Sequence, residues 1–231
     1  MKLQSMLLTT ALFAATIGQA QKNESSVYLR AGVNLANVSI KDNGTIDEAN
    51  MLPSFQVGMQ GDIPVTSFLS LQPGILFTGK GSKTQMGNTT DANYYRATSN
   101  PYYIEVPMNI TFKLPLNKES KFFAGAGGYA AMGIAGNRKA DGKIFGVAFS
   151  NKERIDFSND DPTTSGEEGA GFGIMKRFDF GLTGTAGFEG NAIVVAANYG
   201  LGLAKLQSGT TNGTDNNNKH RVLSITIGFK L

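Results

Sequence analysis

The chain has 231 residues, no cysteine and no tryptophan, and its formal net charge is +3 at pH 7. The absence of cysteine excludes disulfides, thiolate catalysis and thiolate metal sites. The 21 basic and 18 acidic residues are too evenly balanced to indicate a nucleic-acid partner. Beyond the first twenty residues, no segment has the run of about 18 or more apolar residues that a membrane-spanning helix needs.

The N-terminus has the pattern of a secretory signal peptide. Lys2 is its only charge, and Leu7–Ile17 is apolar. Small residues stand at the −3 and −1 positions of a cleavage site after Ala20. We therefore expect residues 1–20 to be cleaved and residues 21–231 to form one domain. The alternative, an N-terminal anchor helix, needs a longer apolar stretch of about 20 residues.

Alternation of apolar and polar residues predicts eight β-strands. The clearest case is Tyr102–Leu114, where the even positions are apolar or aromatic and most odd positions are polar. Such a pattern indicates a strand with one apolar and one polar face, and its length suits a tilted membrane crossing of about 9–11 residues. The expected strands are Val27–Leu35, Phe55–Ile63, Leu69–Lys80, Tyr102–Leu114, Phe122–Ala135, Phe178–Phe188, Ile193–Leu203 and Leu223–Leu231.

The segment Phe122–Ala135 has the weakest strand pattern. It is rich in glycine and alanine, and Phe123 and Tyr129 fall on the face opposite Phe122 and Met132. We expect a β-bulge in this segment to reset the register.

The connections between these strands alternate in length. Long and short connections in turn are typical of an outer-membrane barrel, which has tight turns at one end and long loops at the other. Because the cleaved N-terminus starts on the periplasmic side, we expect the long connections to be extracellular loops and both termini to be periplasmic. The long connections are Ser39–Leu52, Ser82–Asn100, Gly136–Gly173 and Gln207–Lys219, and the short ones are Pro64–Ser67, Pro115–Lys121 and Glu189–Asn191.

The composition of the two faces predicts which one points inward. The polar faces are rich in Gly, Ser, Thr, Asn and Gln, which suit the crowded interior of an eight-stranded barrel. Large apolar residues suit a lipid-facing surface, and Phe and Tyr near both strand ends suit interfacial bands. A soluble barrel such as a lipocalin would have its apolar face inside. The predicted fold is therefore all-β, an eight-stranded antiparallel up-and-down transmembrane β-barrel.

Four stretches resemble the PorT-like outer-membrane β-barrel family of Bacteroidetes: Tyr28–Val38, Leu69–Gly81, Tyr102–Leu114 and Ser224–Leu231. Gly74 stands where the family often has an acidic residue after a Gln-Pro pair. The resemblance implies an eight-stranded barrel in a Gram-negative outer membrane. Its implied partners are outer-membrane lipid and other envelope or secretion-system proteins.

The polar strand faces carry charged residues that the barrel interior would bury. Buried charges must pair, so we predict a salt-bridged plug in which Glu105 meets Lys80 or Arg30, since the third and fourth expected strands are neighbours. The alternative is a narrow conduit for ions or small solutes. The predicted network comprises Arg30, Asp62, Lys80, Glu105, Lys113, Asp179 and Lys230.

Two further groups of residues are candidates for chemistry. His220 is the only histidine and stands between Lys219 and Arg221, so we expect a solvent-facing loop residue; the alternative is a barrel enzyme that acts on lipid or peptide through His220. The third long connection contains oxygen ligands for a weak calcium site, although no EF-hand spacing is present. These ligands are Asp156, Asp160, Asp161 and Glu167.

The sequence contains no cofactor motif. The glycine-rich run at residues 125–128 is not followed by the Lys-Ser/Thr of a phosphate-binding loop. We therefore expect a non-enzymatic barrel whose long loops bind a partner or whose body serves a membrane complex. Gly136–Gly173, the longest connection, is the best candidate for a recognition surface because binding residues concentrate on loops held by a rigid scaffold.

Overall fold

The structure is a computed structural model that describes residues 25–39, 48–158, 174–204 and 219–231. Within these ranges no helix is long and apolar enough to cross a membrane. Their regular secondary structure consists of twelve β-strands. These are β1 (Ser26–Ser39), β2 (Glu48–Pro64), β3 (Leu69–Gly79), β4 (Ser82–Met86), β5 (Tyr94–Pro115), β6 (Lys121–Ile144), β7 (Val147–Arg154), β8 (Asp156–Ser158), β9 (Ile174–Lys176), β10 (Phe178–Glu189), β11 (Ile193–Gly202) and β12 (Lys219–Lys230).

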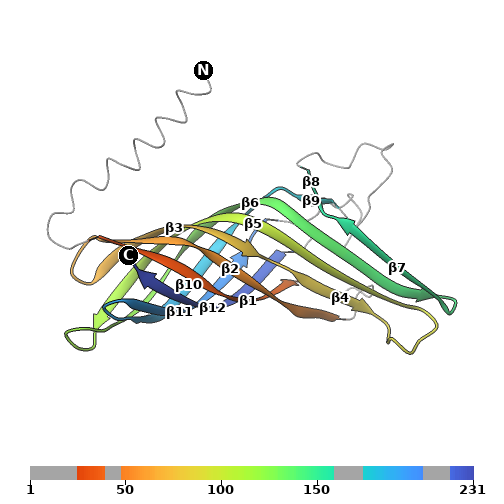
Figure 1. Ribbon diagram of the computed structural model, residues 1–231, viewed down its shortest axis with the longest axis horizontal. Coiled ribbons are helices and arrows are strands. Elements are labelled where there is room, and N and C mark those ends of the chain that lie inside the picture. The colour runs from red at the N-terminus through yellow and green to blue at the C-terminus, as the bar shows by residue number, and fades with distance from the viewer. Residues whose placement is uncertain (1–24, 40–47, 159–173, 205–218) are drawn as a thin grey trace, which may run out of the picture.

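Eight of these strands pair in a closed ring, and Figure 1 shows the barrel that they form. The ring runs β1-β2-β3-β5-β6-β10-β11-β12 and back to β1, and every pairing in it is antiparallel. The predicted eight-stranded up-and-down topology is thus confirmed. β1 begins and β12 ends beside the three short turns, at what we call the turn end of the barrel, and the opposite end is the loop end.

The alternation of side chains matches the predicted faces. In β12, Val222, Ser224 and Thr226 are buried inside, whereas Leu223 and Ile225 are exposed on the outer surface. Outward aromatic rings pair across strands in two bands. The pairs are Phe68–Phe112 and Phe122–Phe188 near the turn end, and Phe55–Phe77 and Phe77–Tyr102 near the loop end.

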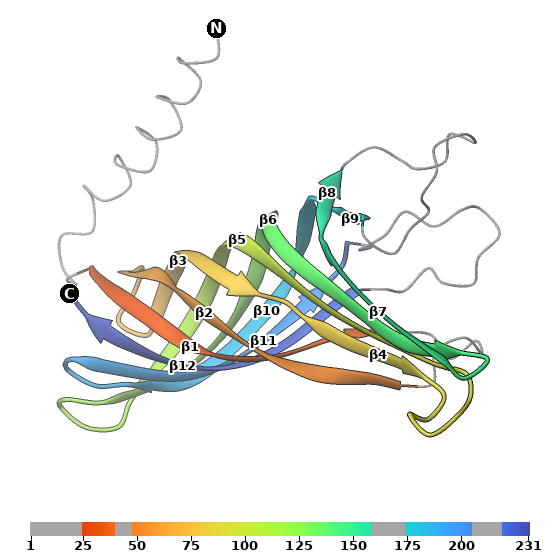
Figure 2. The same cartoon turned by 45° about the vertical axis from the view of Figure 1, so that its right-hand side comes forward.

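Two of the expected loops are mostly strands, so this part of the loop prediction was wrong. Residues 94–99 of β5 and 137–144 of β6 run on beyond the barrel, where they pair with β4 and β7. Residues 48–51 of β2 complete this protruding sheet by pairing with β4. Figure 2 shows its strands side by side, reaching farther than β1, β11 and β12. The sequence did not predict these strands because they are held by hydrogen bonds within hairpins. They do not face lipid, so they lack the alternating large apolar residues that marked the strands of the ring.

The bulge expected in Phe122–Ala135 is present, at Ile134 near the end of that segment. Phe123 and Tyr129 face inward in a regular register, and the irregularity comes later, where Tyr102 pairs with Ala135 and Tyr103 with Gly133. An inward aromatic ring needs space, which glycine on the neighbouring strand provides. A Cβ atom at Gly181, the cross-strand partner of Tyr129, would lie 2.7 Å from Cε1 of that ring.

Residues 1–20, the expected signal peptide, lie outside the described residues, as does nearly all of the expected loop Gln207–Lys219.

Candidate functional site

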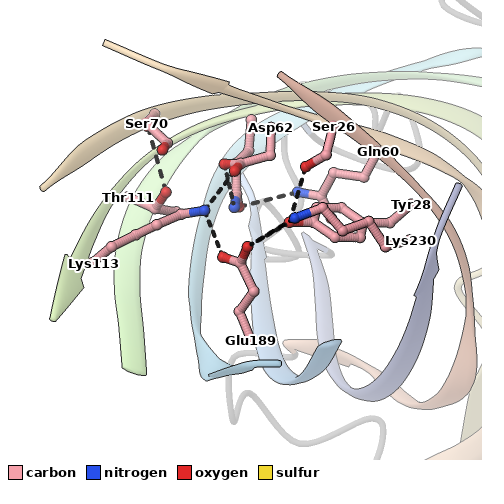
Figure 3. A network of polar contacts seen from close by, with 10 residues as sticks. Ser26, Tyr28, Gln60, Asp62, Ser70, Thr111, Lys113, Glu189 and Lys230 are labelled. Carbon is pink, nitrogen blue, oxygen red and sulfur yellow. Dashed lines mark hydrogen bonds and ion pairs between the residues drawn. The ribbon is translucent and has the colours of Figure 1, made fainter. Parts of the chain in front are cut away.

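Two clusters of ionised side chains fill the barrel interior. The first, the turn-end cluster, is centred on Lys113 of β5 (Figure 3). Lys113 Nζ lies 2.5 Å from Asp62 Oδ2 on β2 and 2.5 Å from Glu189 Oε2 on β10. Glu189 Oε1 accepts a hydrogen bond from the Tyr28 hydroxyl at 3.0 Å and lies 3.7 Å from Lys230 Nζ at the rim. One ammonium thus links strands on opposite sides of the ring.

Amide side chains extend this cluster toward the middle of the lumen. Gln72 donates to Asp62 Oδ1 at 3.2 Å, and Gln60 donates to Gln72 Oε1 at 3.4 Å. Arg30 Nη1 in turn donates to Gln60 Oε1 at 2.6 Å. The hydrogen-bonded chain therefore joins the turn-end cluster to a buried guanidinium.

The second, the loop-end cluster, is centred on Lys80, which stands between β3 and β4. Its Nζ lies 2.7 Å from Glu105 Oε2 and 2.8 Å from Asp179 Oδ2. The Tyr129 hydroxyl donates to the same Asp179 oxygen at 3.1 Å, and Lys80 Nζ sits 3.9 Å from the centre of the Tyr129 ring. Buried charges here are held by ion pairs, hydrogen bonds and a cation–π contact together.

The seven charged residues predicted for the lumen all lie on inward positions of the ring. Lys80 pairs with Glu105, whereas Arg30 bonds Gln60, and Lys230 is partly exposed at the turn-end rim. Glu189 was missed because it was assigned to a turn. Extending the alternation of Phe178–Phe188 by one residue would have placed Glu189 inside. With it, four basic and four acidic residues balance in the lumen.

Two small cavities lie among these side chains. The larger, about 30 Å³, is lined by Arg30, Lys80 and Glu105 among others, and a second of about 20 Å³ also borders Arg30. Such volumes hold about one or two water molecules each.

His220 is not the solvent-facing loop residue that the sequence predicted. It lies on β12, where it pairs with Val38, and only 1% of its surface is exposed. Its Nε2 lies 3.3 Å from the Tyr103 hydroxyl, and the two rings make an edge contact at 5.4 Å. Phe157 of β8 also packs against the Tyr103 ring, in an edge contact at 5.7 Å. The prediction failed because pairing extends β12 to Lys219 and alternation then turns His220 inward.

The expected calcium ligands are mostly not described by the structure. Asp156 is exposed on β8, and Asp160, Asp161 and Glu167 lie outside the described residues. Among the residues that are described, no group of three or more His, Asp or Glu side chains is arranged to hold a metal ion.

Outside the ring, the protruding sheet has a basic outer face. β5 keeps its alternation without a bulge, so Arg96 and Thr98 lie on the same side as Tyr102 and the outward residues of the barrel. On this face the hydroxyl of Ser150 donates to Asp141 Oδ1 at 2.8 Å, and Lys139 lies 3.1 Å from the same oxygen. The Ser150 hydrogen bond and the Lys139 ammonium hold the pKa of Asp141 below its ordinary value.

The tip of the β6–β7 hairpin is apolar and unusually shaped. Phe145 has a positive φ of 49° and is followed by Gly146 at 81°. Phe145 is 88% exposed, and its neighbours Ile144 and Val147 are 58% and 72% exposed. The Phe145 N–H donates to Asn93 Oδ1 at 2.7 Å and the Gly146 N–H to Ala92 O at 2.9 Å. The adjacent β4–β5 turn therefore braces the tip.

Comparison with known sequences agrees with this architecture. Residues 19–208 match the family described as outer membrane protein beta-barrel domain. The chain belongs to this family. It is therefore an outer-membrane β-barrel protein, and the exposed apolar surface of its ring faces lipid. No curated protein matches the chain in sequence.

Several solved outer-membrane proteins are similar to this barrel protein. OprG from Pseudomonas aeruginosa is 13% identical with a TM-score of 0.44, over 92% of this chain and 98% of OprG. Ail, the attachment invasion locus protein of Yersinia pestis, solved with the heparin analogue sucrose octasulfate, is 12% identical with a TM-score of 0.40, over 90% and 100%. Neisserial surface protein A is 11% identical with a TM-score of 0.40, over 90% and 100%.

Proposed function

We propose that this outer-membrane protein is a non-enzymatic recognition protein, anchored by the barrel and contacting a partner protein through its protruding sheet. In this proposal the loop end is extracellular and both termini are periplasmic. The exposed Phe145 at the hairpin tip is the observation that carries the proposal.

Phe145 occupies a conformation that costs energy. Both central residues of the turn have positive φ, for which Asn-Gly is the favoured pair, and a bulky residue there is an outlier. Its ring gains little from burial, because it is 88% exposed. A strained and exposed aromatic residue is a reason to look for a function.

The neighbours of Phe145 make the tip a small apolar surface. Ile144 and Val147 are directly paired across the hairpin and are also exposed. Hydrogen bonds to Asn93 and Ala92 fix this tip on the next turn, so it is presented with little conformational freedom. An aromatic anchor held in place is typical of the centre of a protein interface. The PorT-like resemblance favours an envelope or secretion-system protein as the partner.

The alternatives have less support. A base that acts on lipid or peptide must be reached by substrate, whereas His220 is almost fully buried behind Tyr103. A solute conduit needs a continuous space, whereas the cavities beside the ion clusters around Lys80 and Lys113 have volumes of only about 30 and 20 Å³. Both observations favour a lumen that acts as a structural plug.

Site-specific photo-crosslinking in intact cells tests this function. A photo-reactive residue at Val147 is expected to give protein adducts larger than the 24.5 kDa chain, and the same residue at Lys118, in a turn-end connection, is not. Phe145→Asn should reduce the yield at position 147 severalfold, because Asn keeps the turn and removes the anchor. Equal adducts at both positions, or no effect of the substitution, would contradict the proposal.

A further inference from the structure

The basic outer face of the protruding sheet continues the lipid-facing surface of the barrel. Asp141 is the one acidic residue among the described side chains of this face, and no ion pair other than Lys139–Asp141 is formed there among them. The face carries six basic residues: Lys83, Arg96, Lys139, Lys143, Lys152 and Arg154.

Four residues of this face lie opposite one another across four strands. Lys83 pairs with Thr98, Thr98 with Lys139, and Lys139 with Lys152; we call them the lysine row. Strands lie about 4.8 Å apart, so the row spans about 14 Å. Like charges directly opposite in a sheet repel each other. Lys139 is partly compensated by Asp141 at 3.1 Å, whereas Lys152 forms no ion pair among the described residues, so an anion above the row would stabilise the pair.

The distance of the lysine row from the loop-end aromatic band, measured along the membrane normal, indicates which kind of anion the row would bind. Thr98 is four residues beyond Tyr102, a member of the loop-end aromatic band. At about 3.3 Å per residue and a strand tilt of about 45°, the row stands roughly 9 Å above that band. Phospholipid head groups extend only about 5–7 Å beyond the hydrocarbon core, so phosphates carried on sugars fit this height better.

We propose that the lysine row binds the phosphates of a glycolipid in the leaflet that surrounds the loop end. The ammonium groups of Lys83, Lys139 and Lys152 form ion pairs with phosphate oxygens, and the Thr98 hydroxyl donates a hydrogen bond between them. The lipid lies along the outer face of the sheet, with its acyl chains against the apolar ring below. This site does not depend on what the Phe145 tip contacts.

Binding to the folded protein in detergent tests the site. The probes are a phosphorylated lipopolysaccharide, the same lipid after phosphatase treatment, inorganic phosphate and soluble dextran sulfate. We expect the phosphorylated lipid to bind about tenfold or more tightly than the dephosphorylated lipid. Lys139→Gln combined with Lys152→Gln should weaken binding roughly 25-fold, because each basic residue near an anionic surface contributes about a fivefold effect.

Lys118→Gln combined with Lys121→Gln is the matched control, since it removes the same charge from exposed residues at the turn end. This control should leave binding unchanged, and both variants should keep the heat-modifiable gel mobility of a folded barrel. Equal binding of the two lipid forms, or equal loss in the control, would overturn the proposal.

Two other outcomes would assign the lysine row to a different ligand. Tighter binding of dextran sulfate than of the phosphorylated lipid would assign the row to a soluble polyanion. Displacement of the lipid by millimolar inorganic phosphate would assign it to free phosphate.

Discussion

The lumen and the protruding sheet of this barrel arrange charge in opposite ways. In the lumen, Lys80 and Lys113 each contact two carboxylates within 2.8 Å. On the protruding sheet, Lys139 stands opposite Lys152, another lysine. A buried charge must be compensated, whereas water and salt screen an exposed one. This difference supports our proposals that the lumen charges serve the fold and that the sheet charges bind a ligand.

Removal of Lys113 should have the largest effect on stability. Lys113→Met leaves Asp62 and Glu189 together in the turn-end cluster without their shared ammonium, and breaking a buried pair costs about 3–5 kcal/mol. The free energy of unfolding from urea titration, followed by gel mobility, measures this loss. Lys118→Met, at an exposed turn residue, should change it by less than about 0.5 kcal/mol. A loss as small as that for Lys113→Met would mean that the lumen charges are not a structural plug.

Packing inside the ring should tolerate little added volume. Gly181→Ala places a methyl group against the Tyr129 ring and the Leu201 backbone, which should destabilise the barrel by about 1–3 kcal/mol. Gly184→Ala is the control on the same strand, where the nearest atom is 4.0 Å away. The same titration compares them. If both variants change the free energy of unfolding equally, the lumen has more room at Gly181 than the close approach of Tyr129 implies.

Phe145→Asn should stabilise the hairpin tip while it weakens partner binding. A left-handed conformation costs an ordinary L-residue about 1–2 kcal/mol, and Asn accepts it more readily. Slower hydrogen exchange of the Gly146 amide, which is bonded to Ala92 O, would report the gain. Val147→Asn, at the first residue of β7, should give no such gain. Faster exchange in the Phe145 variant would mean that the ring stabilises the tip.

The smallest effect is expected for Lys152→Gln. It removes the like charge opposite Lys139 and leaves the Lys139–Asp141 ion pair intact, so the hairpin should gain about 0.2–1 kcal/mol. Hydrogen exchange of β7 amides at low salt measures this gain, which should shrink at about 1 M salt. Lys118→Gln serves as the control. A loss of stability would show that Lys152 is held by favourable contacts.

Much of the barrel could be predicted from the sequence. Alternation in Tyr102–Leu114 and its counterparts gave the eight strands of the ring, their inward faces and their antiparallel order. Lumen residues such as Arg30, Lys80 and Asp179 were predictable for the same reason, because period two assigns each residue to a face. Glu189 and His220 were misplaced because each lies at a strand end, where alternation has no further residues to mark it.

Only the tertiary structure decided the rest. Lys80 and Asp179 are 99 residues apart, and the closure of the ring sets them 2.8 Å from each other. The protruding sheet likewise depends on hairpin pairing between segments with no apolar row, as in β7. The sequence by itself determined which residues face lipid and which face the lumen, since alternation is a local property. The closure and register of the whole ring decide which residues meet across the lumen and which segments pair as strands outside the membrane. A local sequence pattern does not encode either property.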